Sequence, residues 1–295
     1  MQQLIRSASE LRAASGVAAS VLDLTKNDNF RIADLVKLIE RDPALTARML
    51  SAVNACQFGF TRQISNLQQA LPILGQRKLR SIALSFSIIN TFSSDVDEKV
   101  YRDFWRRSLT TSLVADRLST SVSNVDRNDA YVAGLLADIG ILALAQLVPE
   151  VYLPVYEQAH DTTLADAERD VFGFDHAEFG ACLLEVWEFP QVLSSAVTDH
   201  HNKEKAKYDG LVRLLLAGNL VPNAIWLAQA SAFEAAFSCF EQFFQFDIQR
   251  FIDLALEVNQ AVAREAEAFQ IGGLRAVDGD TLEIIKDGFG LSAHC

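Results

Sequence analysis

The chain contains few cysteines and few basic residues, and each of these shortages excludes a class of protein. Its four cysteines are scattered without C-x-x-C spacing, which indicates reduced thiols rather than a zinc knuckle or a disulfide framework. Basic residues number 26 against 38 acidic ones, and the formal net charge is −12. Because phosphate neutralisation needs a surplus of Lys and Arg, we expect no general nucleic-acid binding.

Strand patterns and targeting segments are also missing. No alternation of apolar and polar residues recurs, whereas spacings near the helical period recur throughout the chain. The N-terminal segment has no apolar core of signal-peptide length. Tyr131–Leu147 is barely long enough to cross a bilayer, and Asp138 interrupts it. We therefore predict an all-α cytoplasmic protein with no membrane span.

The helical pattern divides the chain into three parts. We expect an N-terminal helical subdomain over 1–95, a helical core over 96–205 and a C-terminal helical extension over 206–295, with the acidic segment 93–98 at the first boundary. The main predicted helices are Leu4–Leu24, Arg31–Glu40, Ala44–Cys56, Asn66–Leu74, Arg77–Thr91, Phe104–Leu118, Asp129–Leu147, Glu150–Ala159, Leu164–Phe172, 176–187, 190–201, Leu211–Ala230, Phe233–Phe246 and Ile248–Phe269.

Local signals support several of these boundaries. Gly75 is expected to break the helix that surrounds it, and Asp175 with Glu178 has the spacing of a capping box. The phenylalanines at 233, 237, 240 and 244 share one helical face, which is more typical of a core than of a partner surface. The final segment, 271–295, has weaker periodicity, and its structure is left open.

The stretch 129–146 is apolar on almost every face, so it should lie in the middle of the fold. Its one ionisable residue is Asp138, and a buried carboxylate costs roughly several kcal/mol unless it is paired. The available partners include His176, His200 and His201, which together with Asp138 could bind zinc, iron or manganese. Each histidine also has a structural explanation. His176 would begin a helix, and the other two would lie in a last helical turn, where a cation suits the helix dipole.

Five stretches of the sequence resemble the HDOD family, in the right order, over about residues 15–220. They are DPALTARMLSAVNACQFGF, ISNLQQALPILGQRKLRSIALSFS, FWRRSLTTSLVADRLS, AYVAGLLADIGILAL and AERDVFGFDHAEFGACLLEVWEFPQVLSSAVTDHH. HDOD is a branch of the HD-domain superfamily of metal-dependent phosphohydrolases, related to the HD-GYP phosphodiesterases. The resemblance implies an HD-domain-like helical bundle over 96–205 with an N-terminal HDOD subdomain.

The departures from the superfamily pattern bear on catalysis. Where the hydrolases carry a first His, a His-Asp pair and a final Asp, this chain has Arg107, Ala137-Asp138 and Asn219. The resemblance places the three histidines, 176, 200 and 201, where HD-GYP proteins have additional ones. Because Arg107 is a permanent cation, we predict that it forms an ion pair with Asp138 in place of a metal.

Two functions follow from the resemblance. The first is a non-catalytic bacterial signalling or regulatory module that binds a protein partner or a small ligand such as a nucleotide, as a monomer or a homo-oligomer. This reading expects no cofactor and no enzymatic activity. The alternative is a hydrolase of nucleotides or cyclic dinucleotides, in which a divalent transition metal is held by Asp138, His176, His200 and His201 in a rearranged ligand set.

Overall fold

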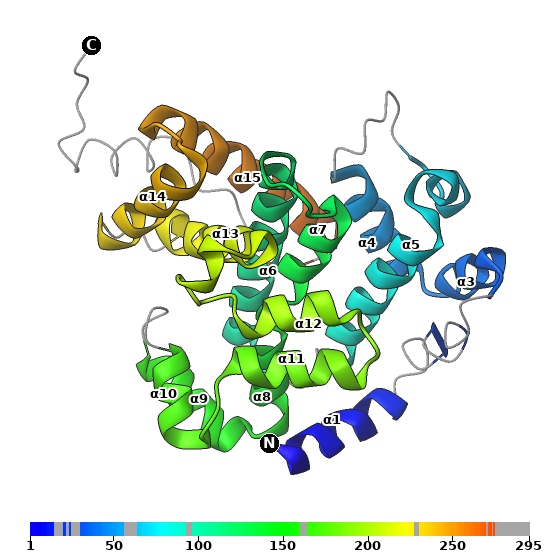
Figure 1. Cartoon of the computed structure of the whole chain (residues 1–295). Helices are drawn as coiled ribbons and strands as arrows, with labels where there is room; N and C mark the ends of the chain where they lie inside the picture. The colour runs from blue at the N-terminus through cyan, green and yellow to red at the C-terminus, as the bar shows by residue number, and fades with distance from the viewer. Residues whose placement is uncertain are drawn as a thin grey trace.

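The computed structural model describes residues 1–14, 20–21, 24, 30–55, 64–92, 96–159, 164–226, 230–269, 271–272 and 274. Within these ranges the regular structure is entirely helical, as predicted (Figure 1). The helices are α1 (Gln2–Ala14), α3 (Ile32–Ile39), α4 (Pro43–Ala55), α5 (Leu67–Thr91), α6 (Glu98–Leu118), η1 (Ser119–Ser121), α7 (Arg127–Leu136), α8 (Ile139–Leu147), α9 (Pro149–Gln158), α10 (Leu164–Phe172), α11 (His176–Val186), α12 (Gln191–Thr198), η2 (Lys205–Lys207), α13 (Gly210–Trp226), α14 (Ala230–Phe244) and α15 (Ile248–Ala268).

Several predicted boundaries are confirmed, and the differences have local causes. Gly75 kinks α5 with a φ of +75°, and the Asp175 capping box is complete. Helix α6 begins before the predicted Phe104 because the Asp97 side chain accepts hydrogen bonds from the backbone of the first turn. Most of the second half of the predicted 4–24 helix and nearly all of 271–295 lie outside the described residues.

Helix α6 lies at the centre of the molecule, against α7, α13 and α15 (Figure 1). Two glycines allow the closest approaches. A Cβ at Gly134 of α7 would lie 2.6 Å from Ser112 Cα, and one at Gly218 of α13 would lie 2.9 Å from the Thr111 carbonyl oxygen. Small residues therefore bring α7 and α13 close to α6, so that side chains from all three helices can meet in the interior.

The predicted central helix over 129–147 is wrong in one respect, because it is two helices. Helix α7 ends at Leu136, α8 begins at Ile139, and Asp138 between them has φ −99° and ψ 16°. The Asp138 carboxylate does not cap α8, since it is turned towards Arg107. The stretch Arg127–Leu147 is long and apolar enough to cross a membrane, yet 89% of its apolar window is buried inside the protein. That burial is the one expected of a core segment.

The C-terminal helices extend this core. Phe233 and Phe240 of α14 are buried and contact Phe251 of α15, with ring centroids 5.2 and 4.9 Å apart, which confirms the predicted core face. Helix α15 then packs against α6 and α4. It buries one carboxyl group, Glu265, whose Oε2 lies 3.4 Å from the Tyr131 hydroxyl of α7.

The first prediction concerns Glu265. Burial raises its pKa from the ordinary 4.5 to about 8. The folded state keeps this proton while the unfolded state releases it, so the stability contribution falls as the pH rises from about 4.5 towards about 8. Glu265→Gln should differ little from the wild type near pH 5 and be more stable above pH 8, by on the order of 5 kcal/mol. Urea unfolding at both pH values measures this difference. Glu267→Gln, an exposed position in the same helix, is the control, and an equal gain at both pH values would contradict the prediction.

The second prediction concerns Gly140, where α8 meets the start of α11. A Cβ at this position would lie 2.0 Å from the His176 carbonyl oxygen, and backbone cannot move aside cheaply. Gly140→Ala should therefore destabilise the protein by about 3 kcal/mol or more, measured by chemical unfolding. Gly272→Ala, where a Cβ meets nothing within 4 Å, is the matched control. A wild-type unfolding midpoint for the Gly140 variant would show that the two helices are not in close contact.

Candidate functional site

The fold brings the six residues singled out from the sequence into one buried cluster. They come from α6, the α7–α8 turn, the start of α11, the turn after α12, and α13: Arg107, Asp138, His176, His200, His201 and Asn219. Segments more than 100 residues apart in the sequence thus supply a single site, which periodicity could not have shown.

Arg107 holds two of these residues at once. Its Nε donates to Asp138 Oδ2 at 2.8 Å, and its Nη2 donates to Asn219 Oδ1 at 3.0 Å. The predicted ion pair is therefore present, and both side chains are buried, at 7% and 1% exposed. Burial alone would raise the pKa of the Asp138 carboxyl, but Arg107, with His200 and His176, holds that pKa well below its usual range.

The other Asp138 oxygen, Oδ1, faces two imidazoles. It lies 3.4 Å from His200 Nε2 and 3.6 Å from His176 Nε2. His200 Nδ1 lies 2.7 Å from the carbonyl oxygen of Val197, which can only accept, so the proton of a neutral His200 is on Nδ1 and its Nε2 is bare. Among the described residues, neither Asp138 Oδ1 nor His200 Nε2 has a hydrogen-bond partner. Two buried acceptors facing each other make a place that favours a cation.

Glu168 and Tyr152 belong to the site, although our sequence analysis missed both. Glu168 Oε2 accepts from the His176 backbone N–H at 2.7 Å and lies 2.6 Å from His176 Nδ1, while its Oε1 accepts from the Tyr152 hydroxyl at 2.6 Å. Burial lowers the pKa of His176, but Glu168 and Asp138 outweigh it and raise that pKa. Burial and Glu168 raise the pKa of Tyr152. The sequence contains one indication that Glu168 is buried, because position 168 lies on the same helical face as the apolar residues Leu164 and Phe172.

His201 completes the cluster. Its Nδ1 lies 3.2 Å from Asn219 Nδ2, and its Nε2 lies 3.0 Å from His176 Nε2. Burial, together with His200 and His176, holds the pKa of His201 well below its usual value. The expected place of His200 and His201 in a last helical turn is wrong, since α12 ends at Thr198 and both follow it. The chain leaves the helix there and turns both rings towards Asp138.

The donor set suits a transition metal in its chemistry. Asp138, His176, His200 and His201 each offer one ligand atom, and these atoms lie within 4.8 Å of one another. A tetrahedral zinc ion with bonds of about 2.1 Å separates its ligand atoms by about 3.4 Å. The separations of Asp138 Oδ1 from the His200 and His176 nitrogens, 3.4 and 3.6 Å, are close to that value.

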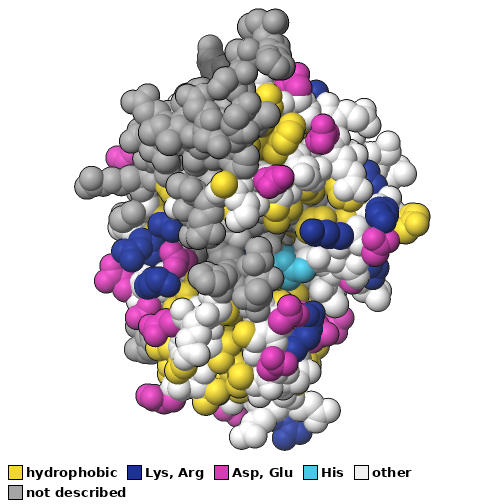
Figure 2. Space-filling view, turned by 90° about the vertical axis from the view of Figure 1, so that its left-hand side faces the viewer, with side chains coloured by type: hydrophobic (Ala, Val, Ile, Leu, Met, Phe, Trp, Pro, Cys, Tyr) yellow, Lys and Arg dark blue, Asp and Glu magenta, His cyan; other side chains and the backbone are white. Residues whose placement is uncertain are grey.

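The cluster reaches the surface at one ring. His176 and His200 are buried, and His201 is the one histidine of the described residues that is partly exposed. A histidine side chain is visible on the face shown in Figure 2.

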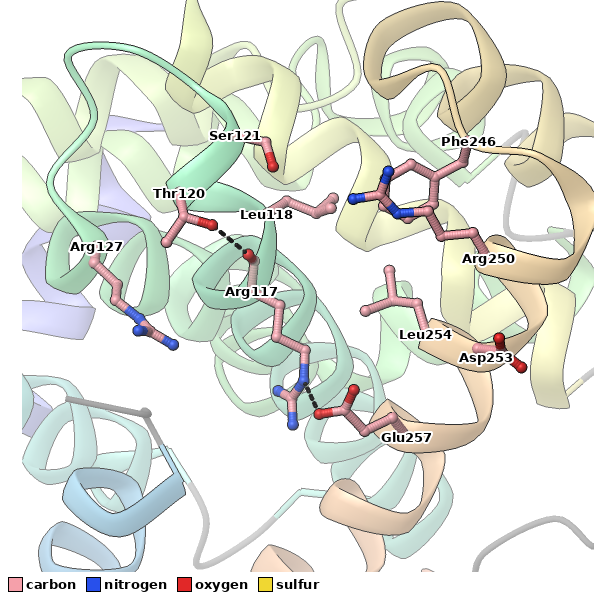
Figure 3. A pocket seen from close by; sticks show the side chains of 10 residues that line it. All are labelled: Arg117, Leu118, Thr120, Ser121, Arg127, Phe246, Arg250, Asp253, Leu254 and Glu257. Atoms are coloured by element: carbon pink, nitrogen blue, oxygen red, sulfur yellow. Dashed lines mark hydrogen bonds and ion pairs between the residues drawn. The ribbon is translucent and has the colours of Figure 1, made fainter. Parts of the chain in front are cut away.

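A separate hollow of about 410 Å³ lies between the end of α6 and α15, lined by other residues (Figure 3). Three arginines line it, but Arg117 pairs with Glu257 and Arg127 pairs with Asp116. The third, Arg250, lies over a phenylalanine ring. Two of the three arginines are thus paired with carboxylates and the third is stacked on an aromatic ring. The candidate site is therefore the cluster around Asp138.

Comparison with known proteins agrees with this geometry. The model of the HDOD domain matches residues 11–203, which is more than half of the chain. The chain belongs to the HDOD family. The matched residues of this HDOD protein include Arg107, Asp138 and the three clustered histidines, while Asn219 lies beyond them.

Three relatives illustrate the range of descriptions among similar proteins. An uncharacterised Treponema pallidum protein is 26% identical over 200 residues, which cover 66% of this chain but only 39% of that protein. A Shewanella amazonensis structure provisionally described as a metal-dependent phosphohydrolase has a TM-score of 0.61 at 16% identity, covering 90% of this chain and 98% of its own. A Marinobacter aquaeolei structure provisionally described as a signal transduction protein has a TM-score of 0.55 at 19% identity, covering 88% and 58%. At these identities the two structures show the shared fold alone.

The third prediction tests the Arg107–Asp138 pair. Arg107→Ala leaves a buried carboxylate without its cation and should destabilise the protein by about 3–5 kcal/mol in urea unfolding. Arg102→Ala, which removes a surface pair with Glu98 on the same helix, should cost less than about 1 kcal/mol. The double variant Arg107→Ala/Asp138→Ala should lose less stability than the sum of the two single variants. Each single change leaves one buried charge unpaired, whereas the double change leaves none. Additive costs would contradict a direct pair.

Proposed function

We propose that this HDOD protein is a signalling or regulatory module that acts by binding a partner or a small ligand, without phosphohydrolase activity of the superfamily type. The observation that carries the proposal is the position of Arg107. Its guanidinium lies between Asp138 and Asn219, the two positions that the resemblance aligns with superfamily metal ligands. A permanent cation of the protein therefore stands beside the carboxylate that would otherwise hold a catalytic metal.

Charge supports this proposal. Asp138 and Glu168 are the acidic side chains in hydrogen-bond contact with the cluster, and Arg107 already neutralises Asp138. One negative charge, on Glu168, is left to compensate a divalent cation. Metal-assisted hydrolysis needs an ion held firmly enough to lower the pKa of a bound water and to clamp a phosphate. A site with its own guanidinium is poorly suited to that work.

A second candidate function rests on a different observation. The unpartnered Asp138 Oδ1 and His200 Nε2 fit a single transition metal, with His176 as a third donor. When bound, such a metal would supply an activated water and a Lewis acid for phosphodiester hydrolysis. In that case Arg107 would orient Asp138 through its other oxygen, and Glu168 would fix the His176 ring through Nδ1. The substrates would be nucleotides or cyclic dinucleotides.

The fourth prediction separates the two candidates. Purified protein, prepared without an affinity tag or chelator, is assayed with added Mn²⁺, Fe²⁺ or Zn²⁺ on cyclic dinucleotides and on a chromogenic phosphodiester. We expect no turnover above that of Asp138→Ala, because the metal needed for a nucleophilic water is not held. Metal-dependent turnover that Asp138→Ala abolishes and Asp253→Ala retains would establish the hydrolase. The second variant controls for loss of an acidic residue outside the cluster.

A further inference from the structure

The hydrogen bonds of the cluster have a fixed direction that starts at Arg107. A guanidinium can only donate, so the Asn219 atom that faces it at 3.0 Å must be the carbonyl oxygen, Oδ1. The Asn219 atom that faces His201 is then the amide nitrogen, Nδ2, at 3.2 Å. Because an amide nitrogen only donates, His201 Nδ1 must be an acceptor. Arg107 thus determines the role of a nitrogen atom two residues away in the network.

A neutral imidazole carries one proton, so a His201 ring that accepts at Nδ1 carries it at Nε2. That Nε2–H points at His176 Nε2, 3.0 Å away. His176 can receive it, because the proton of its neutral ring is at Nδ1, 2.6 Å from Glu168 Oε2. The chain of donors therefore runs without conflict from Arg107 through Asn219, His201 and His176 to Glu168.

A nitrogen that carries a proton cannot bind a metal. We infer that Arg107 and Asn219 together hold His201 in its Nε2–H tautomer and so withhold it from cation binding. The site then keeps Asp138 and His200 as free donors, and His176 becomes the third donor when a cation takes the place of the His201 N–H at its Nε2. His200 is held in the opposite way, since its Nδ1–H is directed to the Val197 carbonyl and its Nε2 is bare. This inference rests on the proposed role of Arg107 as the internal cation of the site, and makes Asn219 a positioning residue.

The inference predicts the effect of one nearly isosteric change. In Asn219→Asp, the new carboxylate can accept from Arg107 with one oxygen and from His201 Nδ1–H with the other. The His201 proton then moves to Nδ1, and Nε2 becomes a free ligand atom supported by a carboxylate, the arrangement common to metal-binding histidines. Asn219 is therefore the residue that separates a three-donor site from a four-donor site in this chain.

The fifth prediction is tested on the metal-free wild type by long-range ¹H–¹⁵N NMR of the histidine rings, at about pH 9, well above the reference histidine pKa of about 6.5. We expect His201 as the Nε2–H tautomer and His200 as the Nδ1–H tautomer, with assignments from His201→Gln and His200→Gln. Asn219→Asp should move His201 to Nδ1–H. A wild-type His201 that carries its proton at Nδ1 would overturn the inference, and this result is read on the wild-type protein, with the variants used only to assign its signals.

A zinc titration gives a second readout. Asn219→Asp should bind Zn²⁺ at least about tenfold more tightly than the wild type, and adding His201→Gln should remove that gain. In the wild-type background His201→Gln should not weaken Zn²⁺ binding, because His201 is not a ligand there, and a loss of affinity would contradict the inference. The outcomes are separable from the proposed function. Metal-dependent hydrolysis by the wild type would overturn the function but not the tautomer, whereas an Nδ1–H spectrum without hydrolysis would overturn the tautomer alone.

Discussion

The buried ion pair between Arg107 and Asp138 is the constraint on which the interior of this HDOD protein depends. Asp138 lies in a turn between two apolar helices, where an unpaired carboxylate would cost several kcal/mol, roughly, and its partner must therefore come from another helix. Helix α6 supplies that partner from the centre of the molecule. The small residues that let α7 and α13 approach α6 are thus part of the same solution, because they bring Asp138 and Asn219 within reach of one guanidinium.

The direction of the hydrogen bonds gives the cluster a definite protonation pattern. Arg107 can only donate and the Glu168 carboxylate can only accept. Each group between them, the Asn219 amide and the His201 and His176 rings, therefore accepts from the Arg107 side and donates towards Glu168. Meanwhile the second oxygen of Asp138 and the bare nitrogen of His200 are left facing each other. One half of the cluster is internally satisfied and the other half still favours a cation, which is why both a regulatory role and a metal-bound role have to be tested.

The same arrangement explains why membership of the HDOD family does not by itself decide the activity. Relatives that share the fold are described in different ways, as a signalling protein and as a metal-dependent phosphohydrolase. The shared helices do not decide between these descriptions for this chain, so the question turns on the side chains of the cluster. In this chain those side chains are Arg107 and Asn219, a cation and an amide, and neither is a good ligand for a transition metal.

The sequence by itself determined the helical class, the family and most helix boundaries, because periodicity, capping signals and ordered motifs are local, and the family resemblance named the six residues that meet around Asp138. The resemblance also indicated the Arg107–Asp138 pair, since it places a permanent cation where the superfamily has a metal-binding histidine. Only the tertiary structure decided that α7 and α8 are separate, that Glu168 and Tyr152 join the site, and which way each hydrogen bond points. Those features depend on atoms brought together from distant helices, and a donor's direction is fixed by the group it faces rather than by its neighbours in the chain.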